Sequence, residues 1–268
     1  MRRLTIGLLA AAPLCTGIEL TAAQETPHPM YYVRQEFVRA ALVSEYEGET
    51  RRWLSDLGGS DVTRDVQWVT VVGPELGYAY VVPIEGHAGI DRVRSTISAS
   101  RQQAAARWST LGAGLQTPID HIETRVIELR PDLSYLPRRV ELDLTLPFRK
   151  YHWYHVIPGL EWQFEEMAMR LVGLYEDRGV AHGFRIYSVL MGSDLPVFLM
   201  VERAGDEVDY AVRAGTIRET VGDESDAIFG QFLSVTRRVE VMEGMTRGDL
   251  SYPPLEPAPG GASAVRDR

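Results

Sequence analysis

Cysteine is almost missing from this sequence. The only one among 268 residues is Cys15, in an N-terminal segment that we expect to be removed. The mature chain would then have no disulfide, no cysteine nucleophile, no cysteine-ligated zinc and no iron–sulfur centre. Its fold must be held by a hydrophobic core, for which a 45% hydrophobic content is sufficient. Lipidation of Cys15 is an alternative, but Leu14 is bulky where bacterial lipoprotein signals carry a small residue.

A basic surface is missing as well. The formal net charge is −9 at pH 7, and removal of residues 1–23, with two Arg and one Glu, makes it −10. Nucleic-acid phosphates need a basic footprint, so this balance argues against a nucleic-acid partner. We interpret the acidic charge as a contribution to solubility.

No apolar run in the sequence is long enough to span a bilayer. The N-terminus has a positive start at Met1–Arg3, an apolar run at Leu4–Leu14 and a small-residue cleavage site at Thr21–Ala23, just before Gln24. This pattern predicts a secretory signal peptide over residues 1–23. We therefore expect an exported protein, periplasmic or secreted, with no membrane association after cleavage near Ala23. The alternative is a retained anchor or an N-terminal core helix.

Recognisable catalytic motifs are also absent. The sequence has no Gly-x-Ser-x-Gly, no His-Glu-x-x-His, no phosphate-binding Gly-x-x-x-x-Gly-Lys and no dinucleotide fingerprint. We accordingly expect no metal site and no cofactor. The sequence identifies neither a reaction nor a ligand.

What the sequence does contain is one order of elements, written twice. In the first half we expect strand 31–38, helix Ser44–Leu57, strands Gln67–Val72 and Tyr78–Ile84, helix Ile90–Leu111 and strand Ile119–Leu129. In the second half we expect strand Tyr151–Ile157, helix Leu160–Asp177, strands Phe184–Met191 and Pro196–Arg203, helix Asp206–Gln231 and strand Phe232–Met242. Each half has the βαββαβ order of a ferredoxin-like unit.

A fixed offset supports an internal repeat. The segment Asp132-Leu133-Ser134-Tyr135 recurs as Asp249-Leu250-Ser251-Tyr252, 117 residues later. We therefore expect a first repeat at 31–135, a linker at 136–150 with a short strand of its own at Val140–Leu146, and a second repeat at 151–252. The Pro- and Gly-rich residues 253–268 are expected to be a disordered tail.

Each hairpin has two unlike faces, because side chains alternate along a strand. We assign the aliphatic faces to the helices; they comprise Val69, Val71, Ala79 and Val81 in one half and Ile186, Val197, Leu199 and Val201 in the other. The opposite, mixed and aromatic faces comprise Trp68, Thr70, Tyr78, Tyr80 and Val82, and Arg185, Tyr187, Phe198, Met200 and Glu202. Apolar patches of this size are rarely left in water. We expect the two aromatic faces to cover each other, packing the sheets into an intramolecular α+β barrel.

The chain resembles the dimeric α+β barrel superfamily over nearly all of residues 31–252. The resemblance is carried by strand Tyr151–Ile157, the following Pro158-Gly159 and the helix with Phe164 early in it. The first half departs from this pattern, with Ala40-Ala41 in place of Pro-Gly. The resemblance implies two ferredoxin-like units in one barrel. Members include antibiotic-biosynthesis-type monooxygenases, haem-degrading monooxygenases and many exported proteins of unknown role.

The barrel interior is the candidate site. Residues that we expect to line a cavity between the sheets combine aromatic surface, one imidazole and charges; they are Glu36, Trp68, Tyr80, Trp153, His155, Arg185, Tyr187 and Glu202. Such a cavity would take a small hydrophobic or aromatic molecule. In the alternative, the aromatic residues fill the barrel as core and Arg185 pairs with Glu202 across neighbouring strands.

His152 and His155 attract attention because they lie three residues apart. On a strand this spacing sends them to opposite faces, so we do not expect them to bind a metal together. Haem-degrading relatives hold iron through a histidine on the second helix of a unit, and neither 90–111 nor 206–231 contains one. His87, just before the first of these regions, we take as a solvated loop residue.

Three functions stay open. The first is an exported protein that binds a small hydrophobic or aromatic ligand inside the barrel. The second, implied by the resemblance, is a cofactor-independent monooxygenase-like enzyme that shapes an aromatic pocket around a phenolic substrate. The third is a structural or interaction module with a filled barrel.

Overall fold

Two sets of four strands, each with two helices, make up the protein in a computed structural model that describes residues 28–57, 66–108, 118–137, 146–192 and 194–255. The first set is β1 (Met30–Val38), α1 (Val43–Leu57), β2 (Val69–Val72), β3 (Gly77–Ile84), α2 (Ala88–Trp108) and β4 (Ile119–Leu129). The second is β5 (Phe148–Val156), α3 (Glu161–Asp177), β6 (Phe184–Met191), β7 (Val197–Ala204), α4 (Glu207–Val235) and β8 (Thr236–Thr246). The expected signal peptide, most of the linker strand at Val140–Leu146 and most of the tail lie outside the described residues.

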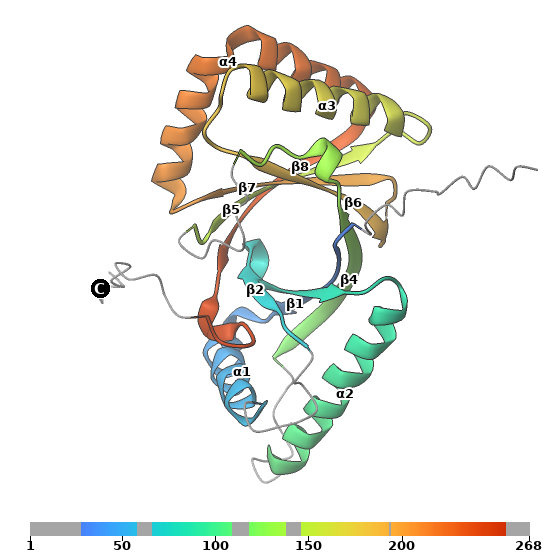
Figure 1. Cartoon of the computed structure of the whole chain (residues 1–268). Coiled ribbons are helices and arrows are strands. Elements are labelled where there is room, and N and C mark those ends of the chain that lie inside the picture. The colour runs from blue at the N-terminus through green and yellow to red at the C-terminus, as the bar shows by residue number, and fades with distance from the viewer. Residues whose placement is uncertain (1–27, 58–65, 109–117, 138–145, 193, 256–268) are drawn as a thin grey trace, which may run out of the picture.

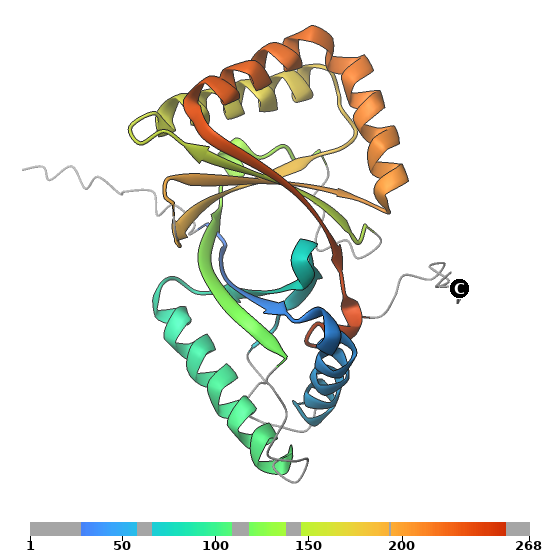
Figure 2. The same cartoon turned by 180° about the vertical axis from the view of Figure 1, so that it is seen from behind.

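The eight strands form one closed barrel in the order β1-β3-β2-β8-β5-β7-β6-β4. Every pairing is antiparallel, including β2 with β8 and β4 with β6, which join the two sets of strands edge to edge. Figures 1 and 2 show α1 and α2 outside one half of the ring of strands and α3 and α4 outside the other. The mixed α+β class and the barrel expected from the sequence are confirmed.

Helix α3 forms where the sequence places its apolar stripe. Phe164, Leu171 and the other helical residues of that stripe are buried against the strands. One aromatic residue from each of β5, β6 and β7 is buried in the same layer: Tyr154, Phe184 and Phe198. Each large apolar side chain buried in this layer contributes about 1.5–3 kcal/mol to folding. The helix starts after Gly159, whose φ of +91° is a left-handed conformation that suits glycine.

Helix α4 is longer than the sequence suggested. Phe232 was expected to open the last strand, but it is a fully buried helical residue, and β8 begins only at Thr236. Ile228, Phe232 and Val235 continue one buried helix face at spacings of four and three residues. The short apolar run around Phe232 fits a strand or a helix by its sequence, and its packing against the strands makes it helical.

The aromatic face of the first hairpin packs against the helices, not inside the barrel. Trp68 stacks on Trp53 of α1 with ring centroids 5.3 Å apart, and Tyr78 meets Tyr46 of α1 at 4.8 Å. The sequence assignment of this hairpin was therefore reversed. The physical reason is that α1 supplies its own large rings, and their contacts need large partners on the strands.

The second hairpin has a different register from the one expected. Ile186 pairs with Met200, and Arg185 pairs with Val201. Because directly paired residues share a face, Ile186 joins Phe198 and Met200 in the layer against the helices. Arg185 and its neighbour two residues on therefore turn to the barrel interior. A shift of one residue in the assumed pairing had exchanged the two faces of β6 relative to β7.

The repeated Asp-Leu-Ser-Tyr segment connects the two halves. The segment after β8 lies beside Trp68 in the first half, where the main chains of Trp68 and Tyr252 exchange two hydrogen bonds of 2.8 and 3.0 Å. The segment after β4 lies beside the second half, where Tyr135 and Phe184 exchange two of 3.1 and 2.9 Å. Each half therefore binds the segment that follows the last strand of the other half.

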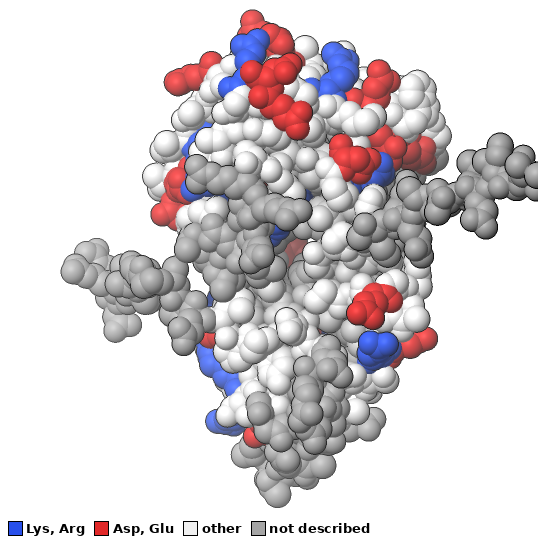
Figure 3. Space-filling view, viewed as in Figure 1, with Lys and Arg blue, Asp and Glu red and all other residues white. Residues whose placement is uncertain are grey.

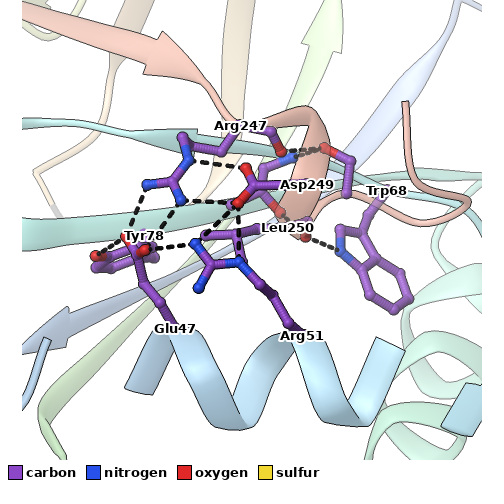
Figure 4. Close-up of polar contacts among 9 residues, drawn as sticks. Glu47, Arg51, Trp68, Tyr78, Arg247, Asp249 and Leu250 are labelled. Carbon is purple, nitrogen blue, oxygen red and sulfur yellow. Dashed lines mark hydrogen bonds and ion pairs between the residues drawn. The ribbon is translucent and has the colours of Figure 1, made fainter. Parts of the chain in front are cut away.

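Ion pairs stabilise both of these contacts between the halves. We call each contact, formed by one Asp-Leu-Ser-Tyr segment and the arginine two residues before it, a clasp. Arg247 donates to both carboxylate oxygens of Glu47 on α1, at 2.7 and 2.9 Å, and to Asp249. Figure 4 shows this group, with Arg51 also reaching Asp249. In the other clasp, Arg130 and Asp132, which lie 117 residues before Arg247 and Asp249, repeat the arrangement: Arg130 bonds Asp132 beside it and also Glu165 on α3.

We predict that Arg247→Gln weakens the fold. Its hydrogen bond holds the pKa of Asp249 below its usual range and is the largest cause of the lowered pKa of Glu47. Carboxylates with lowered folded pKa values stabilise the protein above their unfolded pKa, and this stabilisation is lost as pH falls through the folded pKa. We expect a loss of about 1–2 kcal/mol at pH 7 that shrinks below about pH 5.

Denaturant unfolding of the variant, across this pH range, measures the effect. The exposed Arg218 on α4 provides a control as Arg218→Gln, which should leave the free energy of unfolding unchanged. Equal stability of Arg247→Gln and the wild type at pH 7 would show that the clasp does not hold the halves together.

Candidate functional site

A separate hydrophobic cluster lies inside the barrel. Its buried members come from β4, β6 and β7, and partly buried residues of β1, β4 and β5 pack against them; the set is Ile127, Tyr187, Val189, Val197, Leu199 and Val201 with Tyr31, Val33, Leu129, Tyr151 and Trp153. It is distinct from the two cores under the helices. The interior therefore has an apolar and aromatic wall.

Solvent reaches this wall. Along β1, the residues facing α1 and α2 are buried apart from Arg34, whereas Tyr31, Val33, Gln35 and Phe37, which face inward, are all partly exposed. Ala79 and Val81 of β3 repeat the pattern. In the space-filling view a recess opens near the centre of the molecule, with charged atoms at its bottom (Figure 3). A solidly packed barrel would have buried these inward-facing residues instead.

Three arginines gather inside the barrel on neighbouring strands, and we call them the arginine cluster: Arg149 on β5, Arg203 on β7 and Arg185 on β6. Arg149 pairs directly with Arg203 across the two strands. Arg149 is buried and donates to main-chain oxygens of Leu146 and Phe148. Nη1 of Arg203 is buried and has no hydrogen-bond partner in the part of the chain that the structure describes.

Burial and the neighbouring positive charges shift the pKa values of Arg203 and of the nearby Tyr151. Burial first, and then repulsion from Arg149 and Arg185, lowers the pKa of Arg203 to about 10. Burial raises the pKa of Tyr151 to about 12, although Arg149 and Arg203 oppose the shift. At neutral pH Arg203 is therefore a partly desolvated cation surrounded by like charges and neutral phenols.

Tyrosine rings line the space beside the cluster. Tyr31 and Tyr187 meet edge to face with centroids 6.0 Å apart. Tyr151 lies over β8, where Gly244 leaves room for it: a Cβ at that glycine would come within 3.2 Å of the Tyr151 ring and 2.9 Å of Val71. Glycine at this position thus permits the ring to pack inside the barrel.

A second polar group inside the barrel is balanced in charge. His155 lies 3.3 Å from a carboxylate oxygen of Glu240 and 3.2 Å from Nη2 of Arg238, which also donates to Asp194. Burial, and then Arg238, lowers the pKa of His155, with Glu240 opposing. The imidazole is therefore neutral at pH 7 and can accept a proton.

Trp153 lies between the two polar groups. The guanidinium of Arg125 is 5.2 Å from the centre of its ring, a cation–π contact. Arg125 also donates to Glu123 and to Gln35, both inward-facing by register. This region too has its positive charge matched by a carboxylate.

Four of the eight residues expected to line the cavity do face the interior: Trp153, His155, Arg185 and Tyr187. The other four do not. Glu36, Trp68, Tyr80 and Glu202 lie on the helix-facing side of their strands, for the reasons of packing and register given above.

Glu36 and Tyr80 belong to a buried hydrogen-bonded group under α1. Glu36 is fully buried and accepts from Tyr46 Oη and from Arg34 Nε, both at 2.7 Å. The Tyr46 and Tyr80 hydroxyls are 2.5 Å apart. Burial, followed by Tyr80 and Glu36, raises the pKa of Tyr46 well above its usual range. These groups are satisfied by one another and stabilise the helix layer.

Glu202 and Trp68 also have structural partners. Glu202 accepts from Tyr210 Oη of α4 at 2.9 Å and lies 3.2 Å from Nε2 of His152. Trp68 donates its indole N–H to the main-chain oxygen of Leu250 at 3.2 Å, within the clasp. Glu202 therefore does not pair with Arg185, which was the alternative expectation.

The two histidines of β5 separate as expected. His152 contacts Glu202 on the helix side, and His155 contacts Glu240 inside the barrel. Among the described residues no group of three or more His, Cys, Asp or Glu is placed to hold a metal ion. In the same part of the chain, no helix has the length and apolar character needed to cross a membrane.

Comparisons with known proteins match the fold alone. No family model and no curated protein sequence matches the chain. A protein described as a "putative monooxygenase" from Lactobacillus acidophilus NCFM superposes with a TM-score of 0.51 at 5% identity, over 82% of this chain and 94% of that one. An anthrone oxidase-like protein superposes with a TM-score of 0.53 at 9% identity, over 83% and 92%. The chain shares the fold of these two proteins, and its own eight strands form a closed barrel.

Sequence reasoning named Arg185 as a cavity residue but missed Arg149 and Arg203, the other two members of the arginine cluster. Arg149 was placed in the linker, although the alternation in Arg149, Tyr151, Trp153 and His155 already put it on the inner face of β5. Arg203 would have joined Arg185 had the hairpin register been assigned correctly. The signal was present, but a shift of one residue concealed it.

Cysteine labelling can test whether solvent enters the barrel. In a chain with Cys15 replaced by Ser, we predict that Ala79→Cys is modified by methyl methanethiosulfonate in the folded state, because its side chain faces the interior and is partly exposed. Val82→Cys, on the other side of the same strand and 1% exposed, is the matched control and should react only after unfolding. Mass spectrometry reads both. An unreactive Ala79→Cys would mean a closed, filled interior.

Proposed function

We propose that the protein binds a small hydrophobic or aromatic molecule inside its barrel. The observation that carries this proposal is the exposure of inward-facing Tyr31, Val33, Ala79 and Val81 beside buried neighbours on the same strands. Aromatic surface together with a few polar groups is the usual make-up of small-ligand sites. The alternative of a filled barrel does not explain why these residues reach solvent.

The fluorescent probe N-phenyl-1-naphthylamine, which is neutral and brightens in apolar surroundings, tests this proposal. We predict saturable binding to the wild type and at least about a tenfold loss of affinity in Val33→Trp, whose indole would occupy the interior. Val212→Trp is the matched control, since Val212 is 64% exposed on α4, outside the barrel.

Val81→Trp provides a second blocking variant, and circular dichroism checks that each variant folds. Binding that survives both interior substitutions in folded protein would place the probe elsewhere and contradict the proposal.

A second candidate function is a cofactor-independent monooxygenase-like activity. His155 favours it, because a neutral imidazole inside the barrel can take the acidic proton of a phenolic or anthrone substrate, leaving a phenolate-type anion. This anion can react with dioxygen, and cleavage of the O–O bond then leaves one oxygen in the oxidised product and releases the other as water. The likeness in fold to an anthrone oxidase-like protein is compatible with this chemistry, although at 9% identity it supports the fold alone.

Oxygen uptake with anthrone as substrate distinguishes the two functions. If the protein is an enzyme of this kind, His155→Gln should reduce the rate by about 10²–10⁴-fold, the usual contribution of a general base. His152→Gln, on the helix side of the same strand, is the matched control and should retain the rate. Absence of uptake in the wild type would leave binding as the proposed function.

Two further features belong to this proposal. We propose that the halves are tandem repeats, since they share one order of elements and form clasps at residues offset by 117. Halves that fail to superpose in an experimental structure would contradict it.

We also propose export after cleavage near Ala23, supported by the N-terminal sequence pattern. Determining the first residue of the exported protein tests the cleavage.

A further inference from the structure

Among the described residues, Arg203 differs from the arginines near Trp153 and His155. The cations near Trp153 and His155 each have a carboxylate partner at hydrogen-bond distance. For Arg203, the described residues provide no carboxylate, and its buried Nη1 has no acceptor of any kind. A desolvated guanidinium without an acceptor is costly, and such groups in proteins normally have a partner.

Thr246 adds a second observation. Its Oγ1 is also buried and has no hydrogen-bond partner among the described residues. Thr246 pairs with Val71, which faces the interior opposite Ala79, so the hydroxyl belongs to the inner face of β8. Two polar side chains on the barrel wall, on either side of β5, thus have hydrogen-bonding capacity that the described residues do not use.

We propose that the molecule bound in the barrel is an anion, an aromatic acid whose carboxylate or sulfonate oxygens accept hydrogen bonds from Arg203. This inference rests on the proposed function and specifies its ligand class.

The surroundings of Arg203 suit such a ligand. A guanidinium presents donors in a planar fork that matches a carboxylate, and a partly desolvated site strengthens the charge-assisted bond. Burial, followed by the positive potential of Arg149 and Arg185, lowers the pKa of Arg203, and a bound anion would offset that potential. The rings of Tyr31, Tyr151 and Tyr187 supply the apolar contact for an aromatic body.

The overall charge makes the test demanding. A formal net charge of −9 repels anions at long range, so any preference for an anionic probe must come from a local site. Two fluorescent probes differ by one sulfonate group: 1-anilinonaphthalene-8-sulfonate carries it, and N-phenyl-1-naphthylamine is its neutral parent. The ratio of their dissociation constants therefore measures anion recognition apart from apolar binding.

We expect the wild type to bind the sulfonate at least about tenfold more tightly than its neutral parent, the size of one charge-assisted hydrogen bond. Arg203→Gln should bring the ratio close to one while the affinity for the neutral probe stays unchanged. Arg203→Lys, which keeps the charge without the planar fork, should retain part of the preference. Arg218→Gln, which removes an exposed arginine outside the barrel, should retain all of it.

The outcomes separate this inference from the proposed function. If Val33→Trp abolishes binding of the neutral probe but the wild type shows no preference for the sulfonate, the anion inference is overturned and the binding function stands. An undiminished preference in folded Arg203→Gln also overturns it. If neither probe enters the wild-type barrel, both proposals fail together. Because Arg203→Gln removes a cation from among like charges, we expect it to fold, and thermal unfolding checks this.

Discussion

Closure of the barrel is the constraint on which the rest of the structure depends. A four-stranded ferredoxin-like sheet has two open edges, and each edge offers unpaired main-chain groups. Here the edges of the two sheets pair with each other. The seam between β2 and β8 has only two residue pairs, Val71 with Thr246 and Val72 with Met245. The clasp extends this seam through Trp68 and Tyr252 and anchors it to α1 through Arg247.

Closure also divides the side chains into two environments. The layer between strands and helices takes the large rings, such as Trp68 against Trp53, and in it the buried Glu36 accepts a hydrogen bond from Tyr46. The interior takes smaller aliphatic residues, a few tyrosines, the arginine cluster and the charged residues around His155. Arg203 Nη1 and Thr246 Oγ1, two buried polar atoms without a hydrogen-bond partner among the described residues, both lie on the inner wall of the barrel.

The sequence predicted the order of elements well and the orientation of their faces poorly. Long periodic segments such as the helix with Phe164 and Leu171 followed from spacing alone, because one buried stripe defines a helix. The barrel followed from the repeat and from the need to cover a second apolar face. Which face turned inward depended on the rings that α1 brings to the strands, a property of the tertiary contact and not of the strand.

The site was half predictable for the same reason. Trp153 and His155 were placed correctly because they lie on one strand, where alternation is sufficient. Residues on different strands require the register, and an error of one residue in the β6–β7 hairpin put Glu202 inside and left Arg203 out. The Asp-Leu-Ser-Tyr repeat was visible in the sequence, but its role in joining the halves depends on contacts between residues about 180 positions apart, such as Trp68 with Leu250.

The central claim is that the barrel has an interior open to small molecules, in which Arg203 binds the acidic group of an aromatic acid. The most direct measurement is a crystal structure of the protein with 1-anilinonaphthalene-8-sulfonate. The account predicts the naphthalene rings among Tyr31, Tyr151 and Tyr187, with a sulfonate oxygen within hydrogen-bond distance of Arg203 Nη1. An interior filled by the protein's own side chains, or Arg203 paired with a carboxylate of the chain, would contradict it.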